Sequence, residues 1–220
     1  MPRYDVITFD CYGTLIDWES GIAGAFLHAA AEDGVTLTRD GILHAYAGIE
    51  RRVEAEGYRS YREVLRETAT RVASALDWPL APERAGFLGE SLPSWQPFPD
   101  TNPALERLVA AGCRLGILSN IDDDLLAATR KHFTVDFDIV VTAQQVRSYK
   151  PGHAHFLTAR EIIGESRWLH AAESNFHDVV PTNTLGIDNV WINRQRQQEL
   201  PSGTPTFKFD DLAGLANAIA

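Results

Sequence analysis

Short apolar runs alternate with helical patterns along most of this chain, and this alternation constrains the fold more than any other feature. The runs are nearly continuous in apolar character, which is typical of parallel strands covered by helices on both faces. The expected strands are Tyr4–Phe9, Arg114–Leu118, Phe137–Thr142, Trp168–Ala172 and Val190–Ile192. The expected helices between them are Asn102–Ala111, Asp123–His132, His153–Ile163 and Val179–Leu185. This order predicts an α/β fold, a Rossmann-like doubly wound parallel sheet.

The stretch between Trp18 and Trp95 departs from this alternation, because it contains helical patterns and no strand pattern. These patterns cover residues 18–33, 39–56, 60–77 and 82–91. Two prolines in S-W-Q-P-F-P-D, residues 94–100, are typical of a hinge at which the chain returns to the sheet. We therefore expect an all-helical subdomain at 17–96, inserted into a core domain formed by 1–16 and 97–220.

The composition limits the classes of partner. The chain has 220 residues, of which 45% are hydrophobic, and a formal net charge of -10 at pH 7. An acidic chain is not expected to bind a nucleic-acid backbone, and no apolar run approaches the roughly 18 to 20 residues that span a bilayer. Cys11 and Cys113 imply no disulfide framework, and no signal peptide is recognised. We expect a cytoplasmic protein without a nucleic-acid or membrane partner.

Polar side chains follow four of the expected strands, close to the point where each strand ends. In an open parallel sheet, ligands bind at the carboxyl ends of the strands, so these side chains are expected to converge on one site. They are Asp10, Tyr12 and Thr14 after the first strand, Ser119 and Asn120 after the second, Lys150 beyond the third, and Glu173, Asn175 and Asp178 after the fourth.

The residue types at these positions predict a nucleophilic site. Asp10 is a candidate nucleophile, and Lys150 is expected to keep it ionised and to stabilise charge on the substrate. Ser119 is a candidate oxyanion donor, and Asp178 is expected to position a water or, with Asp10, to bind a metal. Taken alone, each residue has a structural explanation, such as a turn or a helix cap. Their joint placement at successive strand ends favours the functional interpretation.

Four motifs in order carry a family resemblance. F-D-C-Y-G-T-L contains Asp10, L-S-N contains Ser119, Y-K-P contains Lys150, and E-S-N-F-H-D contains Asp178. This set resembles the haloacid dehalogenase (HAD) superfamily of hydrolases over the whole chain. The resemblance implies a HAD-type α/β core and makes the helical insertion the superfamily's cap subdomain.

Tyr12 narrows the resemblance to one branch. Superfamily phosphatases have an aspartate two residues after the nucleophile, where it protonates a leaving alcohol. A phenol with a pKa of about 10 is a poor donor for that step near neutrality. A tyrosine in this place resembles the 2-haloacid dehalogenase branch, because a departing halide needs no proton.

The resemblance implies a two-step reaction with no required cofactor. The Asp10 carboxylate displaces halide from C2 of a short 2-haloalkanoic acid and forms an ester. Water positioned by Asp178 and Asn175 then hydrolyses the ester and releases a 2-hydroxy acid. Ser119 and Lys150 complete the implied catalytic set, and the small carboxylate substrate is bound by Tyr12, Thr14, Asn120, Asn175 and Glu173. Members of the superfamily are often dimers, so a homodimer is an expectation here.

Three positions depart from the dehalogenase pattern. Glu173 stands where that branch has a small serine, and it is interpreted as a metal ligand or as a structural partner of Lys150. The helix G-I-L-H-A-Y-A-G-I-E lacks the expected substrate-binding arginine, whose place falls between His44 and Ala47. Arg51, Arg52, Arg59 and Arg62 are candidate substitutes from neighbouring turns. Phe156 stands where the family has a tyrosine.

These departures leave alternatives open. E-S-N-F-H-D also resembles a branch that includes azetidine-2-carboxylate hydrolase, in which Glu173 or His177 is a candidate donor for a leaving amine. A magnesium-dependent phosphatase is a further alternative, with Asp10, Tyr12 and Asp178 as the expected metal ligands. A non-catalytic protein that binds small acids is the alternative from a different class.

Overall fold

The computed structural model describes residues 4–219, and the chain divides into two compact units. One unit contains residues 1–17, 97–120 and 131–220, and the other contains 18–96 together with 121–130. The segment 121–130, which follows the second strand, therefore belongs with the helical insertion, although the sequence pattern places it in the core.

The first unit is built on a six-stranded parallel sheet with the order β3-β2-β1-β4-β5-β6. The strands are β1 (Val6–Phe9), β2 (Arg114–Ser119), β3 (Ile139–Thr142), β4 (Trp168–Ala172), β5 (Asp188–Ile192) and β6 (Phe207–Phe209). The central strand β1 is fully buried and pairs with β2 and β4, so Phe9 lies beside Ile117 on one side and Ala171 on the other. The predicted parallel sheet is confirmed.

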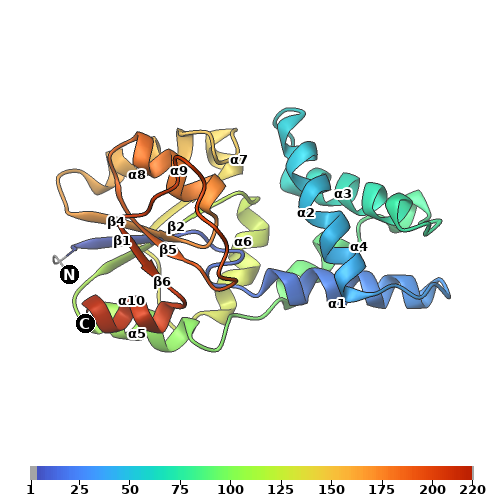
Figure 1. Ribbon diagram of the computed structural model, residues 1–220, viewed down its shortest axis with the longest axis horizontal. Coiled ribbons are helices and arrows are strands. Elements are labelled where there is room, and N and C mark those ends of the chain that lie inside the picture. Colours follow the sequence, from blue (N-terminus) through green and yellow to red (C-terminus); the bar gives the residue numbers. More distant parts are fainter. Residues whose placement is uncertain (1–3, 220) are drawn as a thin grey trace. The chain divides into compact units, whose positions relative to one another are not determined.

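Helices cover both faces of this sheet, as Figure 1 shows. On one face lie α8 (Ala154–Ile163) and α9 (Val180–Thr184), and on the other lie α5 (Thr101–Ala110) and α10 (Leu212–Ile219). Side chains from β1, β2, β3 and α8 form an apolar core that includes Val6, Leu118, Val141 and Phe156. This burial explains why the strands are nearly continuous in apolar character.

Four elements of the first unit lie outside the sequence-based expectations. The edge strand β6 was not predicted, because F-K-F is too short to give a clear pattern. The helix α10 was not predicted either. A short helix, α7 (Ala143–Val146), follows β3. The expected helix at 179–185 is preceded by a π-helical turn at Asn175–Val179, which continues into α9.

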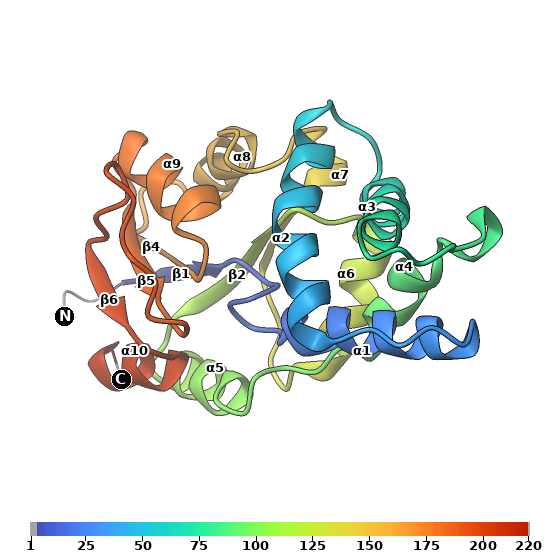
Figure 2. The ribbon, with the colours of Figure 1, turned by 45° about the vertical axis from the view of Figure 1, so that its right-hand side comes forward.

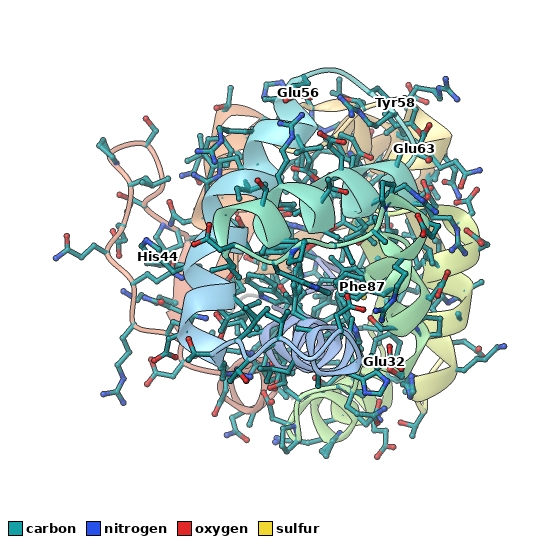
Figure 3. The ribbon with its side chains drawn as sticks, turned by 90° about the vertical axis from the view of Figure 1, so that its right-hand side faces the viewer. Glu32, His44, Glu56, Tyr58, Glu63 and Phe87 are labelled. Carbon is teal, nitrogen blue, oxygen red and sulfur yellow. The ribbon has the colours of Figure 1, made fainter. Side chains whose placement is uncertain are left out.

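The second unit contains α1 (Trp18–Glu32), α2 (Arg39–Ala55), α3 (Tyr61–Ala75), α4 (Phe87–Ser91) and α6 (Asp123–Thr129), visible together in Figure 2. The expected helix at 82–91 is wrong in part, because short 3-10 turns at Pro82–Arg84 and Leu92–Ser94 flank a five-residue α4. Gly86 and the prolines account for the interruption. The aromatic ring of Phe87, which Figure 3 labels, packs edge-on against that of Phe26, with 5.0 Å between the ring centroids.

Two sets of contacts fix the start of α3. Ser60 and Glu63 form a reciprocal capping box, in which the Glu63 carboxylate accepts the Ser60 backbone N–H at 2.9 Å. Asp122, which is buried, accepts the backbone N–H groups of Tyr61 and Arg62 at 2.8 and 3.0 Å. These bonds satisfy N–H groups that a helix start leaves free, and they attach the segment 121–130 to the helical unit. Within residues 4–219, no helix is both long and apolar enough to cross a membrane.

Candidate active site

The loop after β1 presents a carboxylate at the centre of the sheet. The Asp10 backbone N–H continues the ladder by donating to the Ala171 carbonyl at 3.1 Å. Gly13 then adopts a φ of 99°, a conformation that glycine adopts without strain and that turns the chain back toward Asp10. The Thr14 hydroxyl donates to Asp10 Oδ2 at 3.0 Å and accepts the Glu173 backbone N–H at 2.8 Å. Thr14 therefore ties the Asp10 loop to the loop after β4.

Lys150 provides the positive charge of this site. Its side chain is 1% exposed, and its Nζ donates to Asp10 Oδ1 at 2.8 Å, to Asp178 Oδ1 at 2.7 Å and to the Leu118 carbonyl at 2.9 Å. An ammonium group has three N–H bonds, so these three acceptors saturate it. The structure thus brings together three of the predicted catalytic residues, and their chemical roles stay predictions.

Asn120 holds the backbone of Lys150. Its Oδ1 accepts the Lys150 N–H at 2.7 Å, and its Nδ2 donates to the Lys150 carbonyl at 3.1 Å. This geometry supports a positioning role for Asn120, beside the predicted role in substrate binding. The neighbouring Ser119 hydroxyl is buried, and it has no hydrogen-bond partner among the residues that the structure describes. A buried hydroxyl without a partner is available to a bound ligand.

Asp178 lies on the π-helical turn after β4 and is 1% exposed. Its Oδ1 accepts hydrogen bonds from Lys150 and from His170 Nε2, the latter at 2.9 Å. Its Oδ2 is buried and has no partner in the described part of the chain. One oxygen of this carboxylate is therefore fixed, and the other is available to a water or a substrate.

Burial and charge set the protonation of the three groups. Burial raises the pKa of Asp10 above its ordinary value, the Lys150 ammonium opposes this effect, and the charge of Asp178 adds to it. Burial opposes ionisation of Asp178 as well, but Lys150 and the His170 hydrogen bond hold the pKa of that carboxyl well below its usual range. Burial disfavours the Lys150 ammonium, yet the two carboxylates raise its pKa above the ordinary value.

Two further predicted residues contact the chain around residues 197–203. Asn175 is buried, donates from Nδ2 to the Gly203 carbonyl at 2.7 Å and accepts the Leu200 N–H at 3.4 Å. Glu173 Oε1 accepts a hydrogen bond from Gln197 at 3.2 Å, and the Glu173 carbonyl accepts the Trp191 indole N–H at 2.7 Å. These contacts support a structural contribution from both residues. Tyr12 is half-buried on the loop between Asp10 and Thr14.

Sequence reasoning missed two buried histidines. His170 lies within β4 and contacts Asp178, and His155 at the start of α8 lies 3.2 Å from the Ser119 carbonyl through Nε2. Burial and the nearby Lys150 charge lower the pKa of His155 to about 3, so this imidazole is neutral. The available signal was a histidine inside each otherwise apolar stretch, W-L-H-A-A and A-H-F-L.

The helical unit does not supply the expected arginine at its predicted place. His44 is exposed and projects from α2 (Figure 3), and Tyr46 is buried with its ring centroid 5.8 Å from that of Trp18. Two of the candidate substitutes have acidic partners within the same unit. Arg59 pairs with Glu56 at 3.0 Å, and Arg62 pairs with Asp124 at 2.5 Å.

The acidic residues of the site do not form a metal cluster. Among residues 4–219, no group of three or more histidine, cysteine, aspartate or glutamate side chains is arranged to hold a metal ion. The Asp10 and Asp178 carboxylates each direct Oδ1 to the Lys150 ammonium, which occupies the space between them. The phosphatase alternative would instead use the two carboxylates of Asp10 and Asp178 together with Tyr12.

Comparison with known proteins identifies the class. The family model of haloacid dehalogenase-like hydrolases matches residues 4–175, and the chain belongs to this family. The predicted family is confirmed.

Individual relatives cover nearly the full chain. (S)-2-haloacid dehalogenase H-109 of Pseudomonas putida is 28% identical over 234 aligned residues, which cover 99% of this chain and 98% of the relative. The solved structure of the L-2-haloacid dehalogenase RSc1362 superimposes with a TM-score of 0.86 at 21% identity and 99% coverage of both chains. That of the Xanthobacter autotrophicus L-2-haloacid dehalogenase with chloropropionic acid covalently bound gives 0.85 at 20% identity, with 99% and 98% coverage. At these identities the structural likeness establishes the fold.

Proposed function

We propose that this protein is a 2-haloacid dehalogenase, which displaces halide from a short 2-haloalkanoic acid through an ester on Asp10 and gives a 2-hydroxy acid. The observation that carries this proposal is the setting of Asp10. Its two oxygens are held by Lys150 and Thr14, and Tyr12 stands where a phosphatase needs an acid. The (S)-2-haloacid dehalogenase named above is similar over nearly the whole chain, which supports the same assignment.

The first step forms the ester. An Asp10 oxygen attacks C2 of the substrate from the side opposite the halogen, a carbon–oxygen bond forms, and the halide leaves with the electron pair of the carbon–halogen bond. Lys150 and Thr14 hold the carboxylate in one orientation for this attack. The free hydroxyl of Ser119 is the proposed donor to the substrate carboxylate.

The second step hydrolyses the ester at the Asp10 carboxyl carbon. A water bound to the free Oδ2 of Asp178 attacks the carbonyl carbon and passes one proton to that oxygen, and the bond between the carbonyl carbon and the substrate oxygen breaks. The proton on Asp178 then passes to the departing alkoxide, which leaves as the 2-hydroxy acid. Asp10 is regenerated as a carboxylate with one oxygen from water, and the second proton of the water is released to solvent. Because the pKa of Asp178 is low, this carboxylate is ionised and able to orient the water throughout the neutral range.

The reaction uses a small carboxylate substrate and requires no metal. Lys150 supplies the positive charge between the two carboxylates. We assign residues 17–96 to a cap subdomain, and residues 1–16 with 97–220 to the core. The two compact units support this division except at residues 121–130, which group with the helical unit.

The test is product release by purified protein treated with chelator. L- and D-2-chloropropionate, fluoroacetate and azetidine-2-carboxylate are offered in turn, and the same protein with magnesium is offered a panel of phosphate esters. The expected result is metal-independent halide release that Asp10→Asn abolishes. Ring-opened product from azetidine-2-carboxylate alone would assign the enzyme to amine displacement. Magnesium-dependent phosphate release would overturn carbon-centred displacement altogether.

A single turnover in ¹⁸O-labelled water tests the covalent step independently. Enzyme in excess over substrate is expected to place the label in the Asp10 carboxylate, because water attacks that carbon. The hydroxy acid then carries an unlabelled oxygen. Label in the product of this single turnover would mean that water attacks the substrate directly.

A further inference from the structure

A buried hydrogen-bond chain leads from the interior of the sheet to Asp178. Trp168 Nε1 donates to Thr8 Oγ1 at 2.8 Å, Thr8 Oγ1 lies 2.8 Å from His170 Nδ1, and His170 Nε2 lies 2.9 Å from Asp178 Oδ1. Thr8 and His170 are partners in the register of β1 and β4, and both are fully buried. The aromatic ring of Phe156 packs edge-on against the imidazole at 5.2 Å. The imidazole is therefore held from three sides.

The groups at the two ends of this hydrogen-bond chain, the Trp168 indole and the Asp178 carboxylate, set the direction of every bond between them. An indole nitrogen only donates, and an ionised carboxylate only accepts. His170 Nε2 must therefore donate to Asp178. In the tautomer that carries its single proton on Nε2, Nδ1 accepts from the Thr8 hydroxyl. Thr8 in turn accepts from Trp168. Every bond in the sequence Trp168, Thr8, His170, Asp178 is satisfied by one tautomer.

The hydrogen bond from His170 to Asp178 Oδ1 restricts the orientation of the Asp178 carboxylate, which the bond from Lys150 alone does not do. A single ammonium holds one carboxylate oxygen but leaves the carboxylate plane free to turn about it. The His170 N–H reaches the same oxygen from β4, so two donors from different elements fix the plane. The direction of Oδ2, the oxygen without a protein partner, is fixed as a result.

We propose that His170 is a positioning residue for ester hydrolysis, which acts by fixing the carboxylate plane of Asp178 and is itself oriented by Thr8 and Trp168. This proposal rests on the proposed function, because it assumes that Oδ2 of Asp178 orients the hydrolytic water. It assigns no contact between His170 and the substrate. Displacement of halide by Asp10 does not require it.

Two variants at one position test this role. His170→Gln places an amide donor near the former Nε2, and His170→Asn places it near the former Nδ1 and leaves Asp178 Oδ1 without this donor. We expect His170→Asn to slow ester hydrolysis by about 10- to 100-fold, a range typical of lost orientation by a supporting group. Halide formation in the first turnover stays close to that of the wild type. The readouts are a burst of halide equal to the enzyme concentration and the ester-bound protein seen by mass spectrometry after quenching.

Recovery of hydrolysis in His170→Gln supports the proposal, because a merely structural role predicts no difference between the two amides. Equal loss of halide formation and hydrolysis in His170→Asn would overturn it. Where His170→Asn does not fold, Thr8→Val takes its place, with Thr8→Ser as the matched control that keeps the hydroxyl. Thr8→Val removes the hydroxyl that orients His170, and the same accumulation of ester is expected.

A measurement without substrate separates this proposal from the proposed function. Imidazole ¹⁵N chemical shifts of the resting protein report which nitrogen of His170 carries the proton. A proton on Nε2 and an acceptor Nδ1 support the ordered chain even where no halide is released. A proton on Nδ1 alone would overturn the proposal even in an active dehalogenase.

Discussion

The side-chain amide of Asn120 holds the main chain of Lys150 through two hydrogen bonds. It accepts from the Lys150 backbone N–H and donates to the Lys150 carbonyl. The Lys150 ammonium reaches both Asp10 and Asp178 from this fixed point. The side chain that follows β2 therefore determines where the positive charge of the site lies.

Replacing Asn120 is expected to reduce activity through Lys150. Asn120→Ala removes both hydrogen bonds, and we expect the stability to fall by about 1–3 kcal/mol and kcat to fall by roughly a hundredfold, because a small displacement of the ammonium misplaces two carboxylates. Asn120→Asp keeps the acceptor of the Lys150 N–H but replaces the donor with an oxygen that faces the Lys150 carbonyl, so its kcat is also expected to fall. Halide release and thermal unfolding measure both variants. Unchanged kcat in Asn120→Ala would show that the two hydrogen bonds between Asn120 and the Lys150 main chain do not contribute to activity.

Asp10 and Asp178 are expected to affect stability with opposite signs. The folded-state pKa of Asp10 is raised, so its ionised form at neutral pH costs folding free energy. The folded-state pKa of Asp178 is lowered, so its ionised form contributes stability above its unfolded pKa and loses it as pH falls through the folded pKa. At pH 7, Asp178→Asn is expected to lower the unfolding free energy by roughly 2–3 kcal/mol. Asp10→Asn leaves it equal or higher.

Denaturant unfolding of the two variants at pH 7 and at pH 4 checks this pair. Each variant removes one carboxylate and leaves Lys150 with the other, so the two variants have the same net charge. The destabilisation of Asp178→Asn is expected to persist at pH 4, because that carboxyl remains ionised there in the wild type. Equal losses of stability in both variants would contradict the opposite directions of the two pKa shifts.

The pH profile of kcat/KM is expected to show one acid limb from Asp10. The nucleophile must be ionised, and its raised pKa places the loss of activity above the pH of about 3.9 at which an ordinary aspartate titrates. Lys150, whose pKa is raised, stays charged across the neutral range, so it adds no limb below about pH 10. Rates of halide release from pH 3 to 10, measured on whichever of the tested haloacids reacts fastest, give this profile. A basic limb near neutrality would contradict the assignment of the Lys150 charge.

The fold was predictable because its signals are local. Each buried strand appears as an apolar run, and a parallel sheet brings the ends of such runs to one edge. This is why Asp10, Lys150 and Asp178 were expected together although 140 residues separate the first two. The 3-10 turns around α4 escaped prediction because the residues between Pro82 and Pro93 have a pattern typical of a helix, which Gly86 and the two prolines interrupt in the structure.

The supporting residues of the site were not predictable, because their partners are distant and non-repeating. His170 appears in sequence as one polar residue in a core strand, and only the register of β1 and β4 places Thr8 beside it. Asn120 contacts the main chain of Lys150, and a main-chain contact leaves no mark on the residue type of the partner. The loop that binds Asn175 lacks any periodic pattern.

The contact between Gly203 and Asn175 gives the last prediction. A Cβ atom at Gly203 would overlap the Asn175 amide, whereas a Cβ at Gly24, in the exposed face of α1, would meet nothing within 4 Å. Gly203→Ala is expected to lower stability by about 1–3 kcal/mol, because the buried Asn175 amide loses its bond to the Gly203 carbonyl. Gly24→Ala is expected to raise stability by about 0.5–1 kcal/mol through helix propensity.

Thermal unfolding and hydrogen exchange of the two variants distinguish a local from a general effect. Faster exchange confined to residues 197–206 in Gly203→Ala is expected, since Asn175 and Gly203 together anchor that loop. A slower halide release in the same variant would connect the loop to the Asp178 turn, on which Asn175 also lies. Exchange and stability equal to those of the wild type would show that the loop shifts without a loss of folding free energy. The bond between Asn175 and Gly203 would then not be needed for stability, and substrate binding would be the better explanation of Asn175.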